Sequence, residues 1–371
     1  MTSSPRVEGL DFARFLAFVG MVLVNFTVAM GAEGLGSVWA TTFVGALEGR
    51  AAAIFVVLAG IGLGLASKPS PKNSLGIGML SYQENQTNHG DRLFILTTKR
   101  ALFLLVLGLL NSLIFDADIL HYYALYFFFG VLFLRMSSTG LIASIIMLML
   151  CFIIMLLTLD YDLNWDWKSY SYQNFWTFEG FVLNLFFNGW HPVLPWLSFF
   201  LFGIFLSRLS LERVSVQLKL FVIGFIVLIS VEGLSLFILS LLAGAEQDLR
   251  DIATTEPIPP MPFYMIAGMS GACIVLAFSL WISRWLKDTA LLKLCNQTGR
   301  QTLTLYVTHI LLGMGTLEAL GLLEGQNTIG NTDTAVFASA LFCLCAVFYI
   351  WVYSKFFKRG PIENLMRFIA G

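Results

Sequence analysis

The sequence predicts an all-α polytopic membrane protein with about ten transmembrane helices and with both termini on the cytoplasmic side. Two observations lead to this fold class. First, 57% of the 371 residues are hydrophobic and 12% are charged, whereas about 25% of the residues of a soluble domain are charged. Second, the apolar residues form blocks of about 18 to 22, the length that crosses a hydrocarbon core. These blocks use most of the chain, so residues 1–371 are expected to form a single integral-membrane domain.

The apolar blocks are separated by short polar segments. The first block lacks a small-residue cleavage site and is expected to be a retained helix. Residues 68–98 are rich in Asn, Ser, Gly and Gln and predict a flexible cytoplasmic loop. Residues 160–190 predict an outer loop, in which 176–190 is a candidate interfacial helix. The predicted spans are 12–31, 50–67, 99–115, 118–135, 139–159, 192–207, 218–243, 263–283, 300–320 and 335–355.

Basic residues decide the orientation of these spans. When the loops are assigned to alternate sides, 19 of the 22 Lys and Arg residues fall on one side, which the positive-inside rule makes cytoplasmic. The lipid bilayer is therefore the first expected partner, and the location is the inner (plasma) membrane, with multiple passes. A net charge of −1 argues against nucleic acid as a partner. The five cysteines contain no metal-type pair, and no metal is predicted.

Polar groups follow one face of the first predicted span. Asp11 and Arg14 are three residues apart, so they share a face and predict an ion pair at the cytoplasmic rim. Asn25 returns to that face about 16 Å deeper, at about 100° per residue. The face is either a packing surface with one polar contact or the wall of a functional cavity.

Two histidines lie within predicted spans, where ionisable groups are costly and need a reason. Asp118 and His121 are spaced i, i+3, so the carboxylate is placed to orient the imidazole as a general base requires. His309 lies close to mid-bilayer, about 13 Å from Arg300. Arg50, at the outer end of the second span, is placed to hold an anionic or carbonyl oxygen. Each histidine is also compatible with a purely structural role.

These polar groups come from several spans and lie at mid-depth or in the outer half, while a basic rim lies on the cytoplasmic side. The arrangement predicts a cavity that reaches both sides of the protein.

A series of motifs follows along the chain: RVEGLDFAR (6–14), GMVLVN (20–25), GRA (49–51), LAGIG (58–62), DILHYY (118–123), HPVLPWL (191–197), FG (202–203), GRQTLTLYVTH (299–309) and GPIE (360–363) with Arg367. In this order they resemble the motifs of the transmembrane acyltransferase superfamily, whose best-known branch is the heparan-α-glucosaminide N-acetyltransferase family.

The resemblance implies transfer of an acyl group, with acetyl as the expected one, from cytoplasmic acetyl-CoA or another acyl-CoA to an envelope sugar or glycolipid acceptor on the outer side. Asn25 and His309 fall where the family has an intramembrane Asn and a histidine late in the chain. The family also has a histidine between its first two helices, and residues 26–49 contain none.

Under this reading, His121 is the general base that Asp118 orients, and His309 is a rival base or positions the thioester. Asn25 and Arg50 polarise the thioester carbonyl. Three residues at the cytoplasmic rim, Asp11, Arg14 and Arg300, are candidates for binding CoA, and a homo-oligomer is left open. The alternatives are a transporter or flippase for an envelope precursor, with the buried groups as a proton or substrate path, and a membrane sensor or scaffold.

Overall fold

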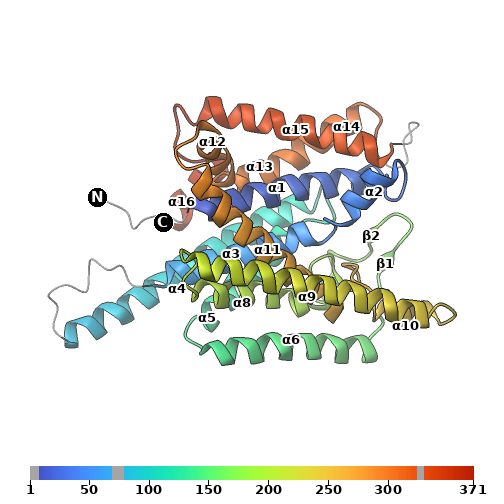
Figure 1. Ribbon diagram of the computed structural model, residues 1–371, viewed down its shortest axis with the longest axis horizontal. Helices are drawn as coiled ribbons and strands as arrows, with labels where there is room; N and C mark the ends of the chain where they lie inside the picture. The colour runs from blue at the N-terminus through green and yellow to red at the C-terminus, as the bar shows by residue number, and fades with distance from the viewer. Residues whose placement is uncertain (1–7, 69–78, 324–329) are drawn as a thin grey trace.

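The computed structural model describes residues 8–68, 79–323 and 330–371. In this part of the chain most residues are helical, and the long helices run side by side along the long axis of the molecule (Figure 1). The regular strands within the described ranges are β1 (Trp165–Asp166) and β2 (Ser171–Tyr172), which pair antiparallel. The predicted all-α class is therefore confirmed.

The helices have the following bounds: α1 (Glu8–Ala29), α2 (Val38–Gly45), α3 (Arg50–Ala66), α4 (Met79–Asn111), α5 (Leu120–Phe133), α6 (Ser138–Thr158), α7 (Phe178–Leu183), η2 (Asn184–Asn188), α8 (Val193–Ser207), α9 (Val214–Leu241), α10 (Gln247–Asp251), α11 (Pro262–Trp285), α12 (Ala290–Gly299), α13 (Thr302–Thr308), η3 (His309–Met314), α14 (Gly315–Ala319), α15 (Thr332–Tyr353) and α16 (Pro361–Ala370). The elements η2 and η3 are π-helical turns.

The chain is a polytopic membrane protein, but the predicted count of ten spans is not reached. Within the described ranges, seven helices are long and apolar enough to cross a membrane, and eight if the bent pair Phe178–Asn188 and Val193–Ser207 is one span. Helix α5 has 14 residues and is about 21 Å long, shorter than a hydrocarbon core of about 30 Å. The predicted ninth span is divided among α13, η3 and α14. The cytoplasmic location of both termini stays a prediction.

The prediction of a flexible loop over 68–98 is wrong from Met79 onward. Helix α4 begins there and has 33 residues, which makes it about 50 Å long. Figure 1 shows its first turns extending beyond the bundle. The polar composition of this segment suggested a loop, because a search for apolar blocks does not detect a polar helix. Residues 69–78 of the predicted loop lie outside the described residues.

The predicted outer loop over 160–190 contains a short hairpin and two short helical elements. Residues Phe178–Asn188 form α7 and η2, so the helix that was predicted within 176–190 is present. The chain then bends by 49° before it continues as α8. The bend turns the segment around Trp190 and His191 back into the protein, where these side chains line a cavity.

Helices α3 and α8 pack closely because glycines face each other. A Cβ on Gly60 would lie 2.0 Å from the Phe200 carbonyl oxygen, and one on Gly203 would lie 2.1 Å from the Val57 carbonyl oxygen. Gly60 and Gly64, spaced Gly-x-x-x-Gly on α3, thus belong to a packing surface. Helix α9, by contrast, buries three residues, Gln217, Gly224 and Ser235. Its many exposed apolar side chains are those of a lipid-facing helix.

Candidate functional site

A hydrogen-bonded pair links the centre of α1 to the start of η3. The Asn25 amide nitrogen lies 3.0 Å from His309 Nε2, and His309 Nδ1 contacts the Tyr306 carbonyl oxygen. One neutral tautomer satisfies both contacts, with Nδ1–H donating to the carbonyl and Nε2 accepting from Asn25. His309 is fully buried, whereas Asn25 is partly exposed.

Tyr306 joins this pair to the carboxylate of Asp118. The Tyr306 hydroxyl donates to Asp118 Oδ1 at 2.9 Å and accepts from the Ile119 backbone N–H at 3.2 Å. The two histidines that the sequence treats as rivals therefore belong to one connected set of polar groups. We call Asn25, His309, Tyr306, Asp118 and His121 the central network.

Asp118 is fully buried and both of its oxygens are engaged. Asn111 Nδ2 donates to Oδ1 at 2.6 Å, and the Leu120 N–H donates to Oδ2 at 2.8 Å. His121 Nδ1 lies 3.3 Å from Oδ2, which favours the tautomer with hydrogen on Nδ1. Nε2 of His121 is then a lone-pair acceptor, and it has no hydrogen-bond partner among the described residues. The predicted orientation of His121 by Asp118 is present.

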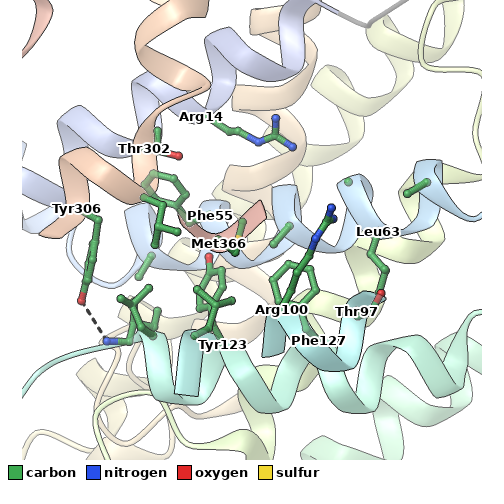
Figure 2. Close-up of a pocket in the computed structure, with 18 of the residues that line it drawn as sticks. Arg14, Phe55, Leu63, Thr97, Arg100, Tyr123, Phe127, Thr302, Tyr306 and Met366 are labelled. Atoms are coloured by element: carbon green, nitrogen blue, oxygen red, sulfur yellow. Dashed lines mark hydrogen bonds between the residues drawn. The ribbon is translucent and has the colours of Figure 1, made fainter. Parts of the chain in front are cut away.

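An inner cavity of about 410 Å³ lies at the basic end of the bundle (Figure 2). Its walls are mostly apolar, but Arg14 of α1 and Arg100 of α4 come to it from different helices. Tyr306 of the central network also lines it, together with Thr302. The cavity thus combines two guanidinium groups with a largely apolar interior.

An outer cavity of about 290 Å³ lies on the other side of the central network and includes Asn25 in its lining. Aromatic side chains surround it, and Glu48 adds a carboxylate. Three buried ring nitrogens in its lining residues lack a hydrogen-bond partner among the described residues, namely Trp190 Nε1, His191 Nδ1 and Trp196 Nε1. These nitrogens are themselves buried, so they lie behind the surface of the cavity and not on it.

The two cavities adjoin, because Met21 and Ala52 contribute to the lining of both. On α1, Arg14 faces the inner cavity and Asn25 the outer one, which confirms that one side of this helix follows both. The start of α5 is divided in the same way. Ala117 lines the outer cavity and Ile119 the inner one, so Asp118 lies where the two cavities divide.

A third, polar cavity of about 360 Å³ lies beside Ser112 and Asp116. The Ser112 hydroxyl is 3.4 Å from His121 Nδ1. Partial burial raises the pKa of the Asp116 carboxyl, so this group holds its proton to a higher pH than a free aspartic acid does. Protonatable groups therefore extend from His121 toward this cavity.

The predicted CoA residues form an ion-pair cluster at the basic end. Arg14 donates to Asp11 Oδ1 at 2.8 Å, and Arg300 Nε donates to Oδ2 at 2.9 Å. Asp11 is fully buried, so its position suits it to holding the two arginines. Arg14 lines the inner cavity, whereas Arg300 is not among its lining residues.

The contacts of Arg50 differ from those predicted for it. It forms an ion pair with Glu232 of α9, and Glu232 also accepts from the Thr255 hydroxyl at 3.0 Å. Although Gly49 and Ala51 line the outer cavity, Arg50 does not. Within the described ranges, no three His, Cys, Asp or Glu side chains are grouped as metal ligands would be.

Several residues of the site were not singled out from the sequence. Asn111 of α4 donates a hydrogen bond to Asp118, and Arg100 of the same helix lines the inner cavity. Arg100 lies next to the predicted boundary between the loop 68–98 and the span 99–115. Trp190 directly precedes the HPVLPWL motif (191–197) and Trp196 lies within it, and both line the outer cavity. The intramembrane Asn111 was a detectable signal, because polar side chains within spans need partners.

The fold and the site define a polytopic membrane protein with a buried polar network between two cavities. Residues 6–240, more than half of the chain, match the family model described as Heparan-alpha-glucosaminide N-acetyltransferase, catalytic. The chain belongs to this family, so the resemblance found in the sequence is confirmed. Residues 211–370 match a second model, described as Protein of unknown function (DUF418). The central network draws on both matched regions, and no curated protein matches the chain.

Proposed function

We propose that the protein is a membrane acyltransferase that moves an acetyl group from acetyl-CoA in the inner cavity to an acceptor in the outer cavity. The observation that carries the proposal is the central network, of which Tyr306 lines the inner cavity and Asn25 the outer cavity. In this proposal the inner cavity opens to the cytoplasmic side of the inner (plasma) membrane, as the distribution of basic residues suggests.

The inner cavity suits an acyl-CoA donor. Arg14 and Arg100 line it, and guanidinium groups bind phosphate oxygens with strong, charge-assisted hydrogen bonds. The rest of its lining is mainly apolar and suits the uncharged arm that carries the thioester. Met21 and Ala52 mark the point at which the arm would meet the outer cavity.

The outer cavity suits a sugar or glycolipid acceptor. Asn25 and Glu48 line it, and their side chains offer hydrogen-bond partners to sugar hydroxyls. Tyr170 and Trp167 add aromatic rings, and aromatic rings have apolar faces with a polar edge.

In this proposal, groups of the central network carry out the reaction. His121 is buried and lines neither cavity, so in this scheme its ring turns toward the acceptor, and Nε2 takes the proton of the hydroxyl or amine as that oxygen or nitrogen attacks the thioester carbon. The carbon–sulfur bond breaks, and the protonated His121 gives this proton to the sulfur, so that CoA leaves as a thiol. Asn25 donates one amide hydrogen to His309 and keeps a second for the developing oxyanion, a contribution of about 2.7–4 kcal/mol in comparable sites. His309 positions Asn25 in this scheme, because its Nε2 already accepts a hydrogen bond.

The test combines acetyl-CoA binding, followed by thermal shift, with transfer measured as acetylated sugar on purified protein in lipid. We expect acetyl-CoA to stabilise the wild type, Arg100→Gln to weaken this binding, and Trp167→Ala to raise the KM for the acceptor. His121→Gln should bind acetyl-CoA normally and lose transfer by about 10²–10⁴-fold. If His309→Gln loses transfer and His121→Gln does not, His309 is the base. If acetyl-CoA does not stabilise the wild type, the proposal fails and substrate flux in liposomes becomes the experiment to pursue.

A further inference from the structure

Helix α16 exposes an apolar surface that has no partner among the described residues. Ile362 and Met366 lie on its inner side, and Ala370 is buried. Leu365, Phe368 and Ile369 lie on a different side, and Phe368 is 88% exposed. At about 100° per residue these three side chains fall within about 100° of each other around the helix. Such a surface marks a site of contact with another apolar phase.

The position of α16 indicates that this phase is the membrane. Helix α15, one of the candidate membrane spans, ends at Tyr353, and α16 begins at Pro361. Helix α16 packs against α4 and α13, and Gly90–Asn111 of α4 is another candidate span. Since it lies close to the ends of two spans, α16 has little freedom to leave the bilayer surface.

Charge around α16 favours an anionic surface. Lys355, Lys358 and Arg359 are exposed between α15 and α16, and Arg367 is exposed on α16 itself. The acidic residue of this region, Glu363, is engaged with α13. A helix with exposed apolar side chains and flanking basic residues is typical of one that lies at the surface of anionic lipid.

Glu363 connects α16 to the helix that carries the central network. One of its carboxylate oxygens accepts from the Leu303 N–H at 2.9 Å and from the Thr304 N–H at 3.0 Å. In return, the Thr304 hydroxyl accepts from the Ile362 N–H at 3.1 Å. The first N–H groups of a helix have no partner within it, so Glu363 caps α13 from another element. Tyr306 lies on the same short helix, one turn further on.

We propose that α16 lies on an anionic phospholipid surface and that this contact, through Glu363, holds α13 and Tyr306 in position. Glu363 is then a positioning residue that does not touch the substrate. The consequence for activity rests on the proposed acyltransferase function, but the contact with lipid does not.

The test is hydrogen–deuterium exchange of the full-length protein in nanodiscs of zwitterionic phosphatidylcholine, with and without anionic phosphatidylglycerol. For the wild type we expect severalfold slower exchange in α16 and at the start of α13 when the anionic lipid is present. Phe368→Ser should abolish both effects. Glu363→Ala should keep the effect in α16 and lose it in α13. Asn364→Ser, a change at an exposed polar position of the same helix, should behave as the wild type does.

Exchange in α16 that is the same in both lipids, and unchanged by Phe368→Ser, would overturn the contact with lipid. Protection of α13 that survives in Glu363→Ala would overturn the coupling. Transfer assays then measure its effect, with a lower kcat in Glu363→Ala and partial recovery in Glu363→Gln, which keeps one acceptor oxygen. Because exchange requires no turnover, an inactive protein that still shows both lipid effects would support the inference and reject the proposed function.

Discussion

Replacing Asp118 by Asn tests how the central network sets the state of His121. The carboxylate accepts from Asn111, Tyr306 and the Leu120 N–H and faces His121 Nδ1. An amide has one acceptor oxygen, so at least one of these donors loses its partner. A hydrogen bond to a charged group contributes about 1.5–3 kcal/mol, and the variant should be less stable by at least that amount. The new NH₂ group also favours hydrogen on His121 Nε2, which removes the proposed base.

We expect the kcat for acetyl transfer to fall by about 10⁴-fold, as it does when the same change inverts the tautomer in a serine-protease triad. Asn111→Leu is the matched control, because it removes one donor to the same carboxylate, lies outside the central network and leaves the acceptor facing His121 intact. Thermal unfolding should place the two variants close together, while initial rates should separate them widely. Equal rates in both variants would refute the tautomer argument.

Three further predictions concern separate parts of the structure. Asn25→Ala should lower kcat by about 10²–10³-fold with little change in the KM for acetyl-CoA, and full activity in steady-state assays would remove Asn25 from the mechanism. Gly60→Ala should destabilise the α3–α8 contact by about 1–3 kcal/mol, seen as a lower melting temperature; Gly233→Ala, which has open space around it, should not. Arg50→Leu should lower the free energy of unfolding by no more than about 3 kcal/mol, seen as a lower melting temperature, because it leaves the partly exposed Glu232 without its arginine. The double change Arg50→Leu with Glu232→Leu should recover stability and keep kcat; a double variant that is stable but inactive would restore a catalytic role for Arg50.

The positions of most helices could be predicted because apolar blocks of membrane length mark them directly. The count of spans was too high because block length alone does not reveal breaks. His309 begins a π-helical turn within the predicted ninth span, and α5 is short although its residues are apolar. The extension of α4 toward Met79 carries no apolar block at all, so a method based on hydropathy assigns it to a loop.

The site was predictable where its contacts are local. The i, i+3 spacing of Asp118 and His121 predicts their contact, and the structure contains it. Contacts between distant segments were not accessible in the same way. Asn25 meets His309 across 284 positions, and Arg50 meets Glu232 across 182. Nothing local to Arg50 indicates that a carboxylate on α9 pairs with it, so it was assigned to the substrate.

Met21 and Ala52 lie between the two cavities, and this position has a consequence for the membrane potential. In the proposed function the two cavities serve opposite sides of the membrane, and this arrangement risks a leak of protons, which a membrane potential drives with about 2.3 kcal/mol per 100 mV for each charge. Methionine is flexible and adapts to irregular gaps, so Met21 is suited to closing the passage whenever no donor occupies it. We expect Met21→Ala to raise the proton permeability of proteoliposomes under an imposed potential, and unchanged permeability would show that the seal lies elsewhere. Under the proposed function, the protein transfers a chemical group across an insulating layer while that layer stays electrically tight.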